Sequence, residues 1–337
     1  MKIGLDTHPA APAESYFQHL AKLLSEYAPQ HEYVVGGEEG EVFDIYHGFR
    51  CEAPAVSRRG RGVTVLTVSD LRFLHDPRLF DLSERLFRLR RYRQALRSAA
   101  RVIALNASAR EELAEGVRVD PRKIEVVMPL GVSAEQASPS EAELEFVRRK
   151  YALPEEFVLM VGEIGDRCRQ PAVFEALLAT GYPAGFVVCG RRTPCSDRLL
   201  AFARRRHAAA RVDFVYEFEP RELAAFFRLA QAFVHLPEAS AGASVAPVVE
   251  ALRAEVPMVL SDTPVNREAA GPAALYVHPE DSAGLAVALE RTLSDERFRR
   301  EMRDRERHRA RLFGGRAVAQ RLSEIHAALQ RELDSVF

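Results

Sequence analysis

The chain has few cysteines, no long apolar run and almost no net charge. Its four cysteines are scattered without a C-x-x-C pair, which argues against a disulfide framework and a zinc site and predicts a reducing compartment. No stretch approaches the roughly 18 apolar residues of a membrane span. The first residues, MKIGLDTH, lack the apolar core of a signal peptide. We therefore expect a cytoplasmic protein.

Charge and composition narrow the class further. The formal net charge is −1 over 337 residues, so recognition of nucleic acid through a global basic field is not expected. Hydrophobic residues make up 47% and charged residues 28%, which is typical of globular proteins. The length allows two ordinary domains, each with its own core.

Short apolar runs alternate with helical patterns along the whole chain. We expect strands at MKIGL, HEYVV, GVTVLTV, RVIAL and KIEVVM, and again at FVLMVG, GFVVCG, RVDFVYE, AFVHL, PMVLS and ALYV. This alternation predicts an α/β fold with parallel sheets covered by helices on both faces. Two successive sets of strands predict two doubly wound domains.

A polar segment that contains Pro139 separates the two sets of strands. We expect a first domain at 1–140, a second at 141–312 and a C-terminal helix at 313–337. That helix has an apolar stripe made of Leu312, Val318, Leu322, Ile325 and Leu329. No strand follows it, so we expect it to pack across the second domain or back onto the first.

One loop of the second domain has the residue types of a phosphate site. Ligands of open parallel sheets bind beyond the carboxyl ends of the strands. The run FVLMVG leads into Gly162, and Arg167 and Arg169 follow it. Glycine permits close backbone approach, and arginine donates forked hydrogen bonds to phosphate oxygens. A tight turn with solvated arginines would give the same pattern.

The stretch GASVAPVVEAL places small residues, among them Ser244, and then Pro247 before an apolar helix. Proline fits the first turn of a helix, and small residues let a ligand reach the exposed N–H groups. Glu250, which we expect in the first turn, presents two acceptor oxygens that can chelate neighbouring ribose hydroxyls. The alternative is an acid that merely stabilises a helix N-terminus.

These stretches combine into a resemblance. In their order and spacing, "FDIYHGF", "VTVLTVSDLRFL", "RVIALNASAREEL", "RKIEVVMPLGV", "VRRKYALPEEFVLMVGEIGDR", "VVEALRAEVPMVLSDTP" and "EAAGPAALYVHPED" resemble the retaining glycosyltransferases of family 4 over roughly 90% of the chain. The resemblance implies the GT-B architecture, in which two Rossmann-like domains face each other across a cleft. It also implies a UDP- or GDP-linked sugar donor, a saccharide or lipid-linked acceptor, a place in polysaccharide biosynthesis, and no metal or other cofactor.

Transferred residue by residue, the resemblance assigns donor binding to Gly162, Arg167, Arg169, Ser244, Pro247 and Glu250. It places Asp70 and Glu238 near the reacting sugar as the catalytic candidates.

The chain departs from the family pattern at two of its key positions. Gly242 stands where the first of two spaced glutamates is usual, and Cys168 stands where a phosphate-binding lysine is usual. Three interpretations follow. The chain is an active transferase with altered donor chemistry, a catalytically silent scaffold or regulator, or a nucleotide-sugar epimerase, for which we find no convincing acid–base set.

The segment RLFRLRRYRQALR, Arg85–Arg97, carries six arginines on an expected helix beside an apolar stripe made of Leu82, Leu86, Leu89 and Leu96. A basic amphipathic helix of this kind can rest on an anionic membrane surface, here the inner face of the membrane. A core-packed helix with a solvated arginine face explains the pattern equally simply, and we favour it. His47 follows an expected strand, where we favour a structural role for it.

Overall fold

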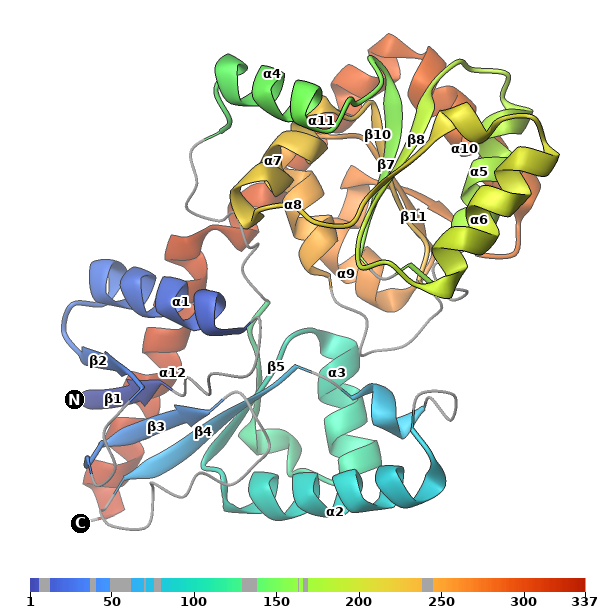
Figure 1. Ribbon diagram of the computed structural model, residues 1–337. Helices are drawn as coiled ribbons and strands as arrows, with labels where there is room; N and C mark the ends of the chain where they lie inside the picture. The colour runs from blue at the N-terminus through green and yellow to red at the C-terminus, as the bar shows by residue number, and fades with distance from the viewer. Residues whose placement is uncertain are drawn as a thin grey trace. The chain divides into compact units, whose positions relative to one another are not determined.

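A computed structural model describes residues 1–5, 13–36, 41–48, 62–69, 71–75, 80–128, 138–162, 164–165, 169–237 and 245–336. The chain forms two compact units (Figure 1). The first draws on Met1–Leu130 and Gly314–Phe337, and the second on Gly131–Ala239 and Ser244–Phe313.

The first unit is built on a parallel sheet of six strands in the order β2-β1-β3-β4-β5-β6. Its strands are β1 Lys2–Leu5, β2 Glu32–Val35, β3 Ile45–Gly48, β4 Val63–Val68, β5 Arg101–Ala104 and β6 Ile124–Val126. Its helices are α1 Ala13–Tyr27, α2 Leu82–Ser98, α3 Ala107–Glu112 and α12 Gly315–Val336. The chain runs out to β2, returns past β1 to β3 and continues the other way, so the sheet is doubly wound.

The last helix, α12, packs along α1 in the first unit. A side chain on Gly315 would place its Cβ atom 2.6 Å from Leu23, so glycine permits the close approach of the two helices. Val318 and Leu322 are buried, as the apolar stripe requires. Leu312, which we expected in the same stripe, lies in a short turn before the helix and is 58% exposed.

We expected His47 to follow a strand, but it lies within β3, so this expectation was wrong. Its side chain is fully buried, and its Nε2 atom is 2.8 Å from the hydroxyl oxygen of Thr67 on β4. The structural role that we favoured for this histidine is confirmed by this burial and contact.

The second unit has a parallel sheet in the order β12-β11-β10-β7-β8-β9. Its strands are β7 Phe157–Val161, β8 Gly185–Cys189, β9 Val212–Val215, β10 Ala232–His235, β11 Met258–Ser261 and β12 Leu275–Val277. The direction of winding reverses between β7 and β10, which pair directly. All eleven expected segments contain strands, and the expected α/β class with two doubly wound parallel sheets is confirmed.

Helices cover both faces of this second sheet. They are α4 Glu141–Lys150, α5 Gln170–Ala179, α6 Pro194–Arg205, α7 Pro220–Leu229, α8 Ala246–Ala254, α9 Pro264–Ala270, α10 Ser282–Ser294 and α11 Glu296–Ala310. Figure 1 shows α5, α6 and α10 on one side of the sheet and α7 and α8 on the other. Val234 of β10 packs in the core with α5 and α10, whereas its neighbour Phe233 contacts Phe227 of α7.

Candidate functional site

The candidate site lies in the second unit, where β7 and β10 end side by side. These two strands flank the reversal of the winding, which is where doubly wound sheets bind ligands. Gly162 follows the last residue of β7, and His235 is the last residue of β10. The described part of the site therefore lies at the carboxyl ends of the two central strands of one sheet.

Gly162 has the backbone geometry that a ligand approaching the main chain needs. Its φ angle is +128°, which side-chain-bearing residues rarely adopt, and an added Cβ atom would meet nothing within 4 Å. Its carbonyl oxygen lies so close to Gly190 that a Cβ there would come within 2.0 Å of it. The two glycines together bring the ends of β7 and β8 into contact.

Arg169 is the N-cap residue of α5 and has the left-handed conformation, with φ at +53°. Its guanidinium donates to the carbonyl of Pro279 at 3.1 Å and lies 3.5 Å from the carboxylate of Glu280. Its Nε atom is buried and has no partner among the residues that the structure describes. The arginine expected to meet phosphate is thus held by the loop after β12, and part of its donor capacity is already used.

The helix α8 has Pro247 in its first turn, as the sequence predicts. Val245 at the N-cap has no polar side-chain atom, so no side chain caps the helix at that position. Glu250 lies in the second turn rather than the first, and the interpretation of this residue as a helix N-terminal acid was wrong. Glu250 is only 2% exposed. Burial of Arg253 lowers the pKa of its guanidinium, and the negative charge of Glu250 partly offsets this shift.

His235 is a site residue that sequence reasoning missed. Its ring stacks on Phe233 at a centroid distance of 5.9 Å, and burial lowers the pKa of the imidazole to about 4. Its Nε2 atom is buried with no partner among the described residues. A histidine that ends an otherwise apolar run before the winding reversal is the signal that could have revealed it.

A second missed feature is a buried series of hydrogen bonds between the ends of β10 and β11. The amide of Asn266 on α9 donates to the carbonyl and hydroxyl oxygens of Ser261 at 3.0 and 2.9 Å. The hydroxyl of Ser261 then donates to the carbonyl of Pro237 at 3.1 Å. Both side chains are almost fully buried, so these hydrogen bonds tie the end of β11 to Pro237, the second residue after β10.

Four of the predicted site residues lie outside the described part of the chain. They are Asp70, Arg167, Glu238 and Ser244, and the family-pattern positions Cys168 and Gly242 lie outside it as well. The structure places Gly162, Arg169, Pro247 and Glu250 in the second unit, on the loop after β7 and on the helix after β10. Within the described residues, no group of three His, Cys, Asp or Glu side chains is arranged to hold a metal ion.

Residues 143–309 match the family described as Glycosyl transferases group 1. The match runs from α4 to α11, over nearly all of the second unit. No curated protein sequence matches the chain significantly.

Solved glycosyltransferase structures resemble the whole chain. Sucrose-phosphate synthase from Thermosynechococcus elongatus is 17% identical with a TM-score of 0.75, and all of each chain is covered. Anabaena HepE in complex with UDP and glucose is 15% identical with a TM-score of 0.76, over 97% of this chain and 100% of HepE. WaaG, a glycosyltransferase involved in lipopolysaccharide biosynthesis, is 14% identical with a TM-score of 0.66, over 96% and 99%. At these identities the likeness shows the fold, which is the two-domain GT-B architecture.

A second candidate surface lies on α2 of the first unit. Leu82 and Leu86, expected in a core-packed stripe, are 70% and 59% exposed, and Phe87 beside them is 60% exposed. Arg85 and Arg93 lie partly buried on the inner side of the helix, beside Leu89 and Leu96, and donate to main-chain carbonyls of neighbouring turns. The interpretation that we favoured, a core-packed helix with a solvated arginine face, is therefore wrong for the first half of the helix, whereas Leu96 in the second half is buried as expected.

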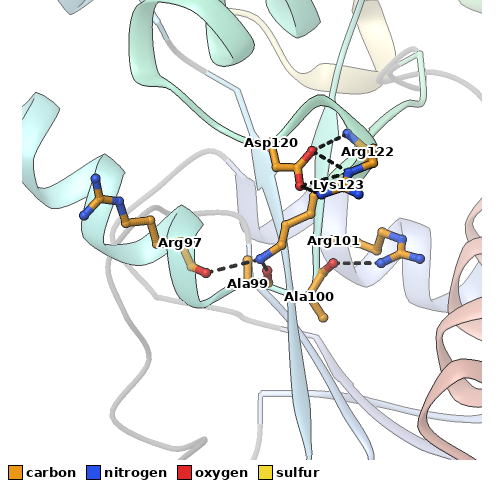
Figure 2. A network of polar contacts seen from close by, with 7 residues as sticks. All are labelled: Arg97, Ala99, Ala100, Arg101, Asp120, Arg122 and Lys123. Carbon is orange, nitrogen blue, oxygen red and sulfur yellow. Dashed lines mark hydrogen bonds and ion pairs between the residues drawn. The ribbon is translucent and has the colours of Figure 1, made fainter. Parts of the chain in front are cut away.

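A network of polar contacts lies at the C-terminus of α2 (Figure 2). The Nζ atom of Lys123 donates to the carbonyl oxygens of Arg97 and Ala99 at 3.3 and 3.0 Å, which places a cation where the helix dipole favours it. Nearby, the hydrogen bond from Arg122 lowers the pKa of Asp120 to about 2. Among the described residues, no helix is long and apolar enough to cross a bilayer.

Proposed function

We propose that the protein is a retaining glycosyltransferase that moves a sugar from a UDP- or GDP-linked donor to a saccharide or lipid-linked acceptor. The observation that carries this proposal is the pair of strands β7 and β10, since an open glycine and an arginine follow β7 and the N-terminus of α8 follows β10, in the unit that matches the transferase family. HepE of the same fold has been solved with UDP-glucose, which supports a nucleotide-sugar donor.

Each residue then has a part in binding the donor. Gly162 lets the diphosphate approach the main chain, and Arg169 neutralises it together with Arg167. The main-chain N–H groups exposed at the start of α8 add donors, which the small Ser244 leaves accessible and Pro247 helps to hold in helical geometry. Glu250 accepts hydrogen bonds from the ribose hydroxyls. Asp70 and Glu238 contact the transferred sugar. In this proposal these groups stabilise the departing diphosphate without a metal ion.

A second candidate function is a silent relative that scaffolds or regulates an active partner. In the sequence, the replacement of the usual glutamate by Gly242 and of the usual lysine by Cys168 favours it. Two features of the described residues favour it as well. Glu250 is almost fully buried, and Arg169 is already bonded to Pro279 and close to Glu280. A donor would have to uncover the first and compete for the second.

Calorimetric titration with UDP, GDP, ADP and their common sugar conjugates distinguishes the two. The transferase proposal expects binding of one nucleotide with micromolar affinity, lost in Glu250→Ala and kept in Glu290→Ala, which removes an exposed glutamate of α10. Absence of binding by every nucleotide at millimolar concentration would reject the transferase and leave the silent relative.

We further propose that the enzyme acts in the cytoplasm and contacts the inner face of the membrane through the Arg85–Arg97 segment of α2. The exposed Leu82, Leu86 and Phe87 offer apolar contacts that a lipid surface can bury, and the arginines beside them attract anionic headgroups. Such a position would bring the chain to lipid-linked acceptors used in the assembly of surface polysaccharides.

A further inference from the structure

A preformed surface on the second unit, formed by α4 and α7, lies on the faces of these helices that the sheet does not bury. A hollow of about 580 Å³ lies between the two helices, and most of its lining is apolar, with Ala142, Phe146 and Val147 on α4 and Ala224 and Ala225 on α7. Glu143, Arg221 and Glu222 also line it. The alanine side chains that line it are small, which leaves room for a larger side chain of another molecule.

Buried polar contacts hold the two helices in place. Glu222 of α7 accepts hydrogen bonds from Lys150 and from the hydroxyl of Tyr151, both at 2.6 Å, and it is 4% exposed. Ser140 and Glu143 form a capping box at the start of α4. The hollow is therefore part of the folded unit, and a partner would not have to order it on binding.

Phe146 stands at the edge of this hollow with 58% of its surface exposed. The residue that follows it, Val147, is the buried anchor of α4, so the phenyl ring is turned away from the core by the helix itself. A large exposed aromatic side chain beside a mostly apolar hollow is a feature of association surfaces.

Charges along α4 are divided by sign on either side of Phe146. The first half carries Glu141, Glu143 and Glu145, and the second half carries Arg148, Arg149 and Lys150. When two such helices lie antiparallel, the acidic half of each faces the basic half of the other. Glu145 and Arg149, which pair within the helix at 2.5 Å, are both exposed and can exchange partners across such a contact.

We propose that this surface binds a second copy of the chain, with a two-fold axis close to Phe146. A two-fold interface uses the same patch on both subunits, so the patch must be complementary to itself. Here a projecting ring lies beside a hollow, and an acidic half-helix continues into a basic one. In the dimer, Phe146 of each copy enters the hollow between α4 and α7 of the partner, and Glu145 of each copy pairs with Arg149 of the other.

The test is sedimentation velocity of the full chain up to about 100 µM, beyond the dissociation constant of a weak specific dimer. We expect a dimer that Phe146→Glu weakens by about tenfold or more, because a carboxylate in the hollow would be desolvated. The matched control is Val287→Glu, which adds the same charge at a side chain 65% exposed on α10 and should leave the dimer intact.

A charge exchange supplies the second readout. Glu145→Arg alone should weaken the dimer, because it faces Arg149 of the partner, whereas Glu145→Arg combined with Arg149→Glu should restore it. These side chains are exposed, so unchanged thermal unfolding reports that the variants fold. A wild-type chain that stays monomeric, a dimer that survives Phe146→Glu, or a double variant that fails to recover would overturn the proposal.

Discussion

The Nε2 atom of His326 on α12 lies 3.3 Å from the Nδ1 atom of His47 on β3. Both imidazoles are fully buried, and their rings meet edge to face at a centroid distance of 5.3 Å. The other ring nitrogen of His47, Nε2, contacts the hydroxyl oxygen of Thr67. A neutral ring has one donor and one acceptor nitrogen, so two uncharged imidazoles can form both hydrogen bonds. The last helix is therefore joined to the sheet of the first unit through a polar contact that holds no charge.

This pair predicts a loss of stability in mild acid. Burial holds the pKa of His47 well below its usual range and lowers the pKa of His326 to about 3, while the unfolded chain binds protons near pH 6.5. The histidines therefore contribute their full stability above pH 6.5, and this contribution falls as the pH drops below it, by up to about 1.4 kcal/mol per pH unit for each residue. Among the described residues, His31 and Tyr33, at and before the start of β2, are further titratable groups close to His326.

Urea unfolding at pH 7.5 and pH 5.5 measures this effect. The variant His326→Gln keeps an amide that can hydrogen-bond but does not titrate, so we expect a smaller difference between the two pH values than in the wild type. His308→Gln removes an exposed histidine of α11 and should leave the difference unchanged. Equal pH dependence in His326→Gln and the wild type would contradict the prediction.

Glu306 on α11 predicts the opposite pH dependence for the second unit. Its carboxyl group is fully buried, and neither oxygen has a partner among the described residues. Burial holds its pKa well above the usual range, opposed by Arg303 and assisted by Glu255. Because the folded-state pKa is raised, stability is fully present below the unfolded value near 4.5 and is lost as the pH rises above it.

Glu306→Met should therefore stabilise the protein at pH 8 by about 1–3 kcal/mol, the usual cost of an unsatisfied buried polar group. Glu301→Met changes an exposed glutamate on the same helix and should have little effect. Thermal unfolding of both variants at pH 5 and pH 8 is the measurement. A Glu306→Met variant that is less stable than the wild type at pH 8 would mean that the carboxylate has a role in the folded state.

Gly190→Ala should disturb the edge of β7 and β8. The new methyl group would lie 2.0 Å from the carbonyl oxygen of Gly162, and a main-chain atom cannot move aside as a flexible side chain can. We expect a loss of about 1–3 kcal/mol in the free energy of unfolding, with weaker binding of any nucleotide. Gly116→Ala is the control, since its Cβ would meet only Leu74 at 3.3 Å. Unchanged stability of Gly190→Ala would show that the two loops can separate without cost.

Contact between α2 and lipid can be tested with vesicles. The full chain should sediment with vesicles that contain phosphatidylglycerol and much less with vesicles of phosphatidylcholine alone. The double variant Leu86→Glu, Phe87→Glu should reduce this binding by about tenfold or more, because each exposed apolar side chain would be replaced by a carboxylate. The matched control, Val287→Glu with Leu312→Glu, changes two equally exposed apolar residues of the second unit. Equal binding by the two double variants would exclude α2 as the contact.

Local patterns predicted the elements of the fold but not their neighbours. The apolar runs marked eleven strands because each strand buries its own side chains. The eleven expected strands do not include β3, a strand of only four residues in which the polar side chains of Tyr46 and His47 interrupt the apolar character. Pairing between β7 and β10 joins Val158 to Ala232, and no local pattern carries information about so distant a partner.

The candidate site was predictable where a residue type has one plain use. Gly162 has a positive φ angle that glycine favours, and Pro247 lies in the first turn of α8. The burial of Glu250 and the bond between Arg169 and Pro279 depend on tertiary packing and were not visible in the sequence. Leu82 and Leu86 show the reverse case, since a helical stripe of leucines is buried only when another element covers it.

The return of α12 to the first unit has a consequence for biosynthesis. His47 and His326 are 279 residues apart, and the whole second unit is made between them. On the ribosome the second unit is complete before α12 emerges, so it can fold while the first sheet still has an uncovered face around His47. The first unit is then the later of the two to reach its native state, and it is the unit in which we expect nascent chains to depend on chaperones.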